Sequence, residues 1–227
     1  MGQSENFSSQ VAGLIAVLRQ ARRDNEQLYY YATLDKNRPG RSIMPVTPFV
    51  FEFFIYNSLY QVDWSASLQA GCVRNHPETF TETKQQSKLE KFLKPHIREE
   101  PALLYKAFLP IRDATLEGDW TAVVPDSRIS AKDGECFFDR LRVLQTRLHN
   151  TNQPEQLQVN NSLFDLIGKC RWYVYLVRNN IFHGSKTLGE TYEPKQRRRI
   201  EIYLTFLRCV TELFFSVCGK RLLRHDP

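Results

Sequence analysis

The residues of this chain that are best suited to chemistry gather in one short segment. Arg178, Asn179 and Asn180 follow an apolar run, and His183 and Gly184 come after two further apolar residues. Histidine changes its charge near pH 7, so it suits proton transfer, and the planar fork of arginine suits a negatively charged group. Gly184 fits the position that follows the end of a helix, where a positive φ is common. The segment therefore predicts a polar site held at the end of a buried helix.

The spacing within this segment constrains how the three polar side chains could meet. On a continuing helix, Asn179 and His183 are four residues apart and share a face. Arg178 is five residues from His183, about 140° away around an ideal helix. We therefore expect either a break in the helix before His183 or pairing of the residues across a dimer. A purely structural interpretation stays open, because a histidine near a helix C-terminus is favourable for the helix dipole and Arg178 could be a surface charge.

The segment resembles the HEPN family, the higher eukaryotes and prokaryotes nucleotide-binding domain. The family's signature is an arginine, four to six residues, and a histidine, often with asparagine directly after the arginine. Here it reads Arg178-Asn179-x3-His183, followed by Gly184. The family places this signature in a pair of long helices near the end of a helical bundle. The specific resemblance covers roughly residues 160–218.

This resemblance implies a metal-independent endoribonuclease without a cofactor. In such enzymes the 2′-hydroxyl of the RNA attacks the adjacent phosphate and leaves a 2′,3′-cyclic phosphate. By resemblance, His183 is the acid and base, Arg178 stabilises the charge on the phosphorane, and Asn179 orients the imidazole or the phosphate. The family commonly forms homodimers in which both copies of the motif line one cleft.

The resemblance also implies a biological setting, namely a toxin–antitoxin or antiviral defence system with an antitoxin or regulatory protein as a partner. Some toxin members carry a tyrosine two residues after the histidine, where a nucleotidyltransferase modifies them. Ser185 stands at that position here, so we do not expect that form of control. Two alternatives stay open. The first is a non-catalytic HEPN-like module that binds RNA or a protein. The second is a structural subunit whose aromatic segment 49–60 forms an interface, although ordinary core is the simpler interpretation of that segment.

Positive charge is concentrated in the last third of the chain. Residues 151–227 contain 12 Lys and Arg against 7 Asp and Glu, whereas residues 1–150 contain 19 against 18. A localised basic face suits a polyanionic partner. We expect RNA contacts from Lys186 and from Arg197, Arg198 and Arg199, whose cations oppose the helix dipole in a first turn. A solvated basic turn is the alternative.

The elements that must position these residues are predicted to be all helical. Apolar residues recur at helical spacing in 8–34, 81–109 (broken near Pro95 and Pro101), 130–150, 158–183 and 194–218. Segment 49–60 could be a strand by its alternation, but its aromatic residues recur at intervals of 4, 3 and 4, which favours a helix. Loops are expected at 69–80, 113–128 and 151–156. The last two helices would form an antiparallel hairpin.

We therefore predict a single all-α domain over 1–227, a HEPN-like helical bundle. Its core would lie within 130–220, and 1–128 would be an N-terminal helical elaboration.

Composition excludes several other classes of protein. Hydrophobic residues make up 42% and charged residues 25%, as in soluble globular domains. The N-terminus lacks the basic and apolar regions of a secretory signal. No segment is expected to be long enough to span a bilayer, because the uncharged stretches 42–51 and 53–62 are too short, and no membrane partner is expected. Five scattered cysteines without a CxxC pair predict reduced thiols in a cytoplasmic protein. No GxxxxGK[ST], HExxH or GxSxG motif supports a kinase, zincin or hydrolase.

Overall fold

The computed structural model describes residues 2–33, 46–116, 131–182 and 194–221, and the described chain is built from helices. Within these residues there is no strand, and the single β-bridge joins Val62 to Asn75. The prediction of an all-α fold is therefore confirmed. The elements are α1 (Gly2–Thr33), α2 (Val46–Gln61), α3 (Trp64–Ala70), α4 (Glu82–Glu99), α5 (Pro101–Ala107), α6 (Leu109–Arg112), α7 (Ala131–His149), the 3-10 turn η1 (Pro154–Gln156), α8 (Asn161–Phe182) and α10 (Pro194–Arg221).

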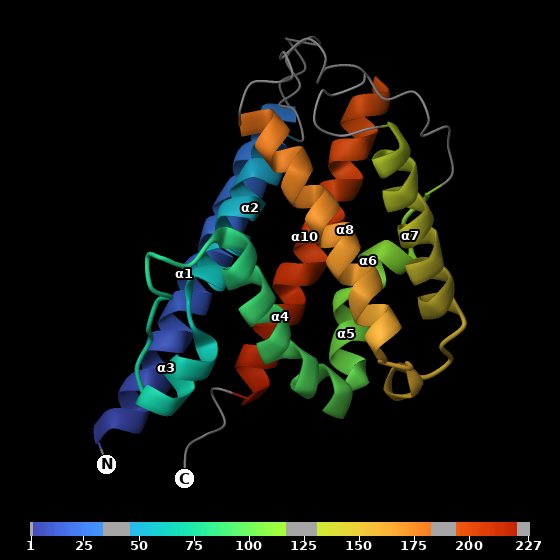
Figure 1. Ribbon diagram of the computed structural model, residues 1–227. Coiled ribbons are helices and arrows are strands. Elements are labelled where there is room, and N and C mark those ends of the chain that lie inside the picture. Colours follow the sequence, from blue (N-terminus) through green and yellow to red (C-terminus); the bar gives the residue numbers. More distant parts are fainter. Residues whose placement is uncertain (1, 34–45, 117–130, 183–193, 222–227) are drawn as a thin grey trace.

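Helix α10 runs through the middle of the bundle. It contacts α2, α5 and α6 along its length, with α1 and α2 on one side of it and α7 on the other (Figure 1). A helix surrounded in this way must be apolar on most of its faces. Its buried side chains include Ile200, Phe206, Leu207, Phe214 and Val217.

The apolar character of α10 corrects the expectation that no segment is long enough to span a bilayer. By length and composition alone, Gln196–Lys220 could cross a membrane. The expectation rested on runs without any charge, whereas this helix has a few charges scattered through an otherwise apolar stretch. Of the apolar window in this helix, 72% is buried inside the bundle, as in the core helix of a soluble protein.

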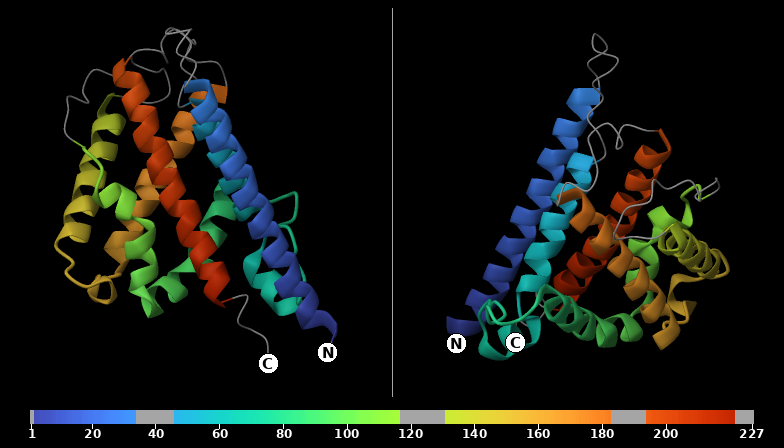
Figure 2. Two further views of the ribbon diagram at one scale, coloured as in Figure 1. Left: turned by 180° about the vertical axis from the view of Figure 1, so that it is seen from behind. Right: turned by 45° about the horizontal axis from the view of Figure 1, so that its top comes forward.

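Helices α8 and α10 run in opposite directions, and they cross obliquely rather than lying side by side along their lengths (Figures 1 and 2). Helix α8 packs along α7, whereas α10 packs along α2. The segment between the two helices, 183–193, lies outside the described residues. The bundle is therefore held together around α10, and α8 crosses it as a second layer.

The aromatic segment after Pro48 is a helix, as its 4-3-4 spacing predicts. Phe49, Phe53, Tyr56 and Tyr60 are all buried in α2, so this spacing marks the face of the helix that meets the core. The alternation that could indicate a strand does not produce one here, because the buried face of α2 packs against α1, α4 and α10.

Two details of the predicted helix boundaries differ from the structure. Helix α4 continues through Pro95, so the break expected there is wrong, while the one at Pro101 is confirmed because α5 starts at that residue. Because Pro95 has no N–H, the carbonyl of Lys91 loses its helical hydrogen bond. Both residues lie on the exposed side of α4, where water can replace the lost bond. Helix α3 is an element that the sequence did not predict. Its N-cap is Asp63, which accepts a hydrogen bond from the amide of Ala66.

Candidate functional site

The last turn of α8 places Arg178 and Asn179 together. Arg178 Nη1 donates a hydrogen bond to Asn179 Oδ1 at 2.8 Å, and both residues are half-buried. The guanidinium of Arg178 lies over the ring of Phe53 in α2, with its Cζ 5.0 Å from the ring centroid. A cation over an aromatic face gains electrostatic attraction as well as packing. Two contacts from different helices therefore fix the direction of the guanidinium.

The histidine of the motif lies just beyond the described chain. Helix α8 has its last described residue at Phe182, so His183 follows it directly in the sequence. His183, Gly184 and Lys186 lie outside the described residues. Their spacing relative to Arg178 and Asn179 therefore stays a prediction.

Asn179 is also connected to helices α2 and α4, through the hydroxyl of Tyr175. The hydroxyl of Tyr175, one turn earlier on α8, donates to Glu82 Oε2 at 2.9 Å, and the hydroxyl of Tyr60 donates to the other oxygen of the same carboxylate. Burial raises the pKa of Tyr175, a hydrogen bond from Asn179 acts in the opposite direction, and Glu82 raises the pKa further. A polar chain thus connects the end of α8 to the first turn of α4 and to α2.

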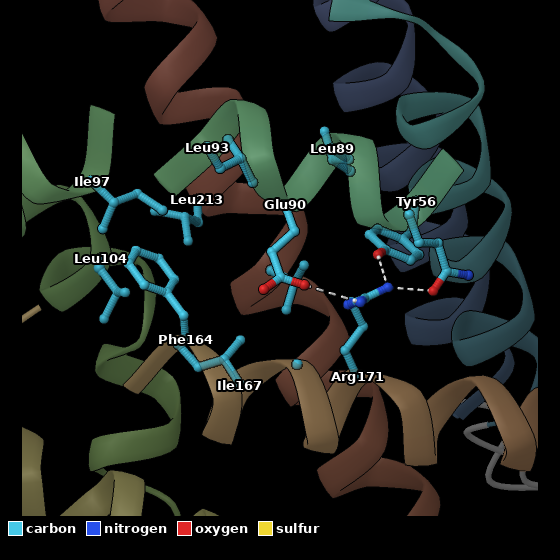
Figure 3. Close-up of a pocket in the computed structure, with 13 residues that line it drawn as sticks. Tyr56, Leu89, Glu90, Leu93, Ile97, Leu104, Phe164, Ile167, Arg171 and Leu213 are labelled. Atoms are coloured by element: carbon cyan, nitrogen blue, oxygen red, sulfur yellow. Dashed lines mark hydrogen bonds and ion pairs between the residues drawn. The ribbon is translucent and has the colours of Figure 1, made fainter. Parts of the chain in front are cut away.

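Arg171 joins the same three helices two turns before Arg178 (Figure 3). Its Nη1 donates to the hydroxyl of Tyr56 at 3.3 Å and to Gln86 Oε1, and its Nη2 lies 3.3 Å from Glu90 Oε2. These groups form the polar wall of a cavity of about 50 Å³ whose other walls are mostly leucine, isoleucine and phenylalanine. Burial lowers the pKa of Arg171, but its bonds to Tyr56 and Glu90 outweigh this and raise it, so the side chain stays charged.

This supporting network is absent from the predictions made from the sequence. Its partners Tyr60, Glu82 and Glu90 come from α2 and α4, far from the motif along the chain. The one available signal was on α8 itself, where Arg171, Tyr175 and Arg178 are spaced by 4 and 3 and therefore share one side of the helix.

The basic first turn of α10 differs in part from its predicted role. Arg197 and Arg198 share the carboxylate of Glu201, at 3.4 and 3.5 Å, and Arg198 also donates to the carbonyl of Thr115 at 3.2 Å. Arg199 is only 1% exposed. Its guanidinium is therefore not available to a phosphate at the surface of the described chain, and the expectation that Arg199 contacts RNA is corrected.

The two predicted parts of the site lie at the same end of the bundle but at different corners. Helix α8 ends near α2, whereas α10 begins on the side of α6 and α7 (Figure 1). Arg178 and Asn179 are therefore brought together, and Arg197 and Arg198 are not brought into contact with them.

Neither a disulfide nor a metal centre is found among the described residues. All five cysteines are free thiols, and no group of three or more His, Cys, Asp or Glu side chains in the described ranges could hold a metal ion.

A groove of about 550 Å³ lies between α1, α5 and α10. Its walls carry four cations and no carboxylate, and its apolar part includes Ile15, Leu103 and Phe215; the cations are Arg19, Arg23, Lys106 and Lys220. Arg19 pairs with Glu212 and Lys220 with Glu100 just outside the groove. The groove could not be predicted from local sequence patterns, because its residues come from three helices that are distant in the chain.

Comparison with protein-family models, with curated proteins and with solved structures finds no significant match for this chain.

Proposed function

We propose that this chain is a metal-independent endoribonuclease of the HEPN type. The observation that carries the proposal is the arrangement at the end of α8, where Arg178 and Asn179 are hydrogen-bonded to each other about one turn before His183 in the sequence. The contacts with Phe53 and with the Tyr175–Glu82 pair support it further, because a catalytic group must be held in one direction before the substrate arrives.

In the proposed reaction, the 2′-hydroxyl of one ribose gives its proton to the imidazole of His183. Its oxygen forms a bond to the adjacent phosphorus, and the bond from phosphorus to the 5′-oxygen of the next nucleotide breaks. The protonated imidazole of His183 then gives this proton to the 5′-oxygen, which leaves a 2′,3′-cyclic phosphate and a free 5′-hydroxyl and returns the histidine to its neutral form. Arg178 stabilises the extra negative charge of the phosphorane, since a fixed cation acts most strongly where charge develops.

Asn179 has a positioning role in this proposal. Its amide contacts both Arg178 and Tyr175, so it couples the guanidinium to the polar chain that ends at Glu82. If the helix continues to His183, Asn179 lies on the same face as the imidazole. The homodimer, the toxin or antiviral role and the cytoplasmic location belong to this proposal and rest on the resemblance alone.

The test is to incubate the purified protein with RNA in EDTA and to look for 2′,3′-cyclic phosphate ends. We expect cleavage by the wild-type protein and a loss of at least about a hundredfold for His183→Ala and Arg178→Ala. The matched controls are His149→Ala and Arg142→Ala, which remove the same residue types from the exposed side of α7. Uncut RNA, or equal cutting by the variants at the end of α8, would contradict the proposal.

The second candidate is a non-catalytic module that binds RNA or an acidic partner. The groove between α1, α5 and α10 favours it, because its lining carries four cations, a feature that suits a polyanion, although Arg19 and Lys220 already pair with Glu212 and Glu100. The contacts of Arg178 with Phe53 and Asn179 also fit a role in stability alone. RNA that is bound but not cut by the wild-type protein, with binding abolished in Arg23→Ala and Lys106→Ala, would favour this candidate.

A further inference from the structure

An exposed tryptophan, stacked on a half-buried tyrosine, lies on α8 before the proposed catalytic residues. Trp172 is 44% exposed, although most large apolar side chains of the described bundle are buried. Its indole stacks on the ring of Tyr175, with the centroids 5.2 Å apart and the planes inclined by 22°. An exposed tryptophan stacked on a second ring offers a flat surface to a further ring.

The backing ring of this pair is held in place. The hydroxyl of Tyr175 is bonded to Glu82, and its ring lies 6.3 Å from the ring of Phe53, measured between centroids. These contacts come from α4 and α2, so Tyr175 cannot turn away without breaking its interactions with two other helices. Trp172 therefore has a fixed surface on which to lie, and it loses little conformational entropy when a ligand covers it.

The position of Trp172 relates it to the proposed site. Asn179 follows it by seven residues, which places the two within about 20° of each other around the helix and about 10 Å apart along the axis. At a rise of roughly 3.4 Å per stacked nucleotide, this distance corresponds to about three nucleotides. A strand whose phosphate lies at Asn179 can thus reach Trp172 with a nearby base.

The surroundings of Trp172 favour a nucleic-acid base over a protein interface. Asp165 and Lys169 lie on the same exposed side of α8 and form an ion pair of 2.7 Å, with 62% and 55% of their side chains exposed. Asp and Lys are depleted in the cores of protein interfaces, whereas Trp is a common stacking partner for unpaired bases. A single flat ring among polar side chains matches the second case.

We propose that Trp172, backed by Tyr175, is a stacking platform for a base of single-stranded RNA that flanks the cleaved linkage. This inference rests on the proposed ribonuclease function and names a substrate-binding residue for it. The platform selects single-stranded RNA, because a base inside a duplex cannot present its face to an indole.

The experiment measures binding without cleavage. A fluorescently labelled 2′-O-methyl RNA oligonucleotide lacks the attacking hydroxyl, so its affinity can be measured by anisotropy while it stays intact. We expect Trp172→Ala to weaken binding by about 5- to 150-fold and Trp172→Phe to retain most of the affinity, because a ring remains. Phe51→Ala is the matched control, since Phe51 is equally exposed, at 45%, but lies on α2. Its affinity should equal that of the wild-type protein.

The outcomes separate this inference from the proposed function. Normal cleavage of RNA together with unchanged binding by Trp172→Ala would overturn the platform and leave the ribonuclease intact. Binding that depends on Trp172 in a protein that cuts no RNA would support the platform and count against the ribonuclease. An equal loss of RNA affinity in Phe51→Ala would assign Trp172 to a general apolar surface and overturn the inference. A shift of Trp172→Ala from dimer to monomer with unchanged RNA affinity would assign Trp172 to a protein-binding surface and also overturn it.

Discussion

The guanidinium of Arg178 lies over the ring of Phe53, with Cζ 5.0 Å from the ring centroid. Arg178 belongs to α8, near the end of the chain, and Phe53 belongs to α2, more than a hundred residues earlier. The N-terminal half of the protein therefore does more than complete the core. Helices α2 and α4 supply Phe53 and Glu82, which hold the last turns of α8 in place.

This interaction makes the ring of Phe53 a positioning group for Arg178. In Phe53→Leu the side chain stays apolar, but the cation–π attraction, worth about 0.5–2 kcal/mol, is removed. We expect kcat for RNA cleavage to fall by about two- to thirtyfold in single-turnover assays, on the basis of the proposed function. Phe138→Leu makes the same change at a core position on α7 that is equally buried, at 1%. Similar losses of kcat in both variants would show that Phe53 acts through general stability alone.

A buried ion cluster joins α1, α2 and α10. Glu52, at 2% exposure, pairs with Arg22 at 2.6 Å and also accepts a bond from Thr211. Removing one partner of a buried ion pair leaves the other charge uncompensated, so Glu52→Ala should lower the free energy of unfolding by about 3–5 kcal/mol in urea titrations. Glu212→Ala removes a carboxylate that also pairs with Arg22 but is 42% exposed. We expect it to cost at most about 1 kcal/mol, and equal effects would contradict this account.

The helical fold could be predicted because apolar and aromatic residues recur at helical spacing in the sequence. The apolar spacing in α7, α8 and α10 and the aromatic spacing in α2 each mark one buried face, and each of these segments is a helix in the structure. The prediction of a break at Pro95 was wrong, because a proline is tolerated in a helix where the carbonyl that loses its hydrogen bond faces water. Whether a residue faces water depends on the packing of neighbouring helices, which local spacing does not encode.

Of the candidate site, the sequence predicted the pair Arg178 and Asn179 but not the side chains that hold this pair in place. Arg178 and Asn179 are neighbours in the sequence, so their proximity was certain, whereas their contacts with Phe53 and Tyr175 depend on how α8 meets α2 and α4. The burial of Arg199 was missed for the same reason. In the sequence it continues a basic run with Arg197 and Arg198, but on a helix each residue turns by 100°, and the third of the run points into the core.

The arginines in the first turn of α10 should therefore have two different effects, the exposed ones on RNA affinity and the buried one on stability. Arg197→Ala and Arg198→Ala should each flatten the dependence of RNA affinity on salt concentration by about 0.7 in log–log slope, the value for each phosphate of a single strand that a cation neutralises. Arg199→Ala should instead lower the urea midpoint of unfolding, because its side chain is buried. Arg142→Ala, from the exposed face of α7, serves as the control. An unchanged slope in the Arg197 and Arg198 variants would remove α10 from the RNA-binding surface.

The buried thiols give the protein a specific sensitivity to alkaline pH. Burial raises the pKa of Cys170 and of Cys209 from 9.0 to about 12. In the unfolded chain these thiols lose their protons near pH 9, whereas in the folded chain they keep them up to about pH 12. The unfolded state therefore binds fewer protons between these values, and the stability that the thiols contribute is present below pH 9 and declines as the pH rises towards 12.

The measurement compares urea unfolding of the wild-type protein and of Cys170→Ala/Cys209→Ala between about pH 8 and pH 11. The double variant should be less stable at the lower pH, because two buried side chains are truncated, but its stability should fall less steeply as the pH rises. The same burial predicts that Cys72 and Cys136, which are half-buried, react with iodoacetamide before Cys170 and Cys209 do. Parallel stability curves for the two proteins would show that other groups cause the alkaline loss.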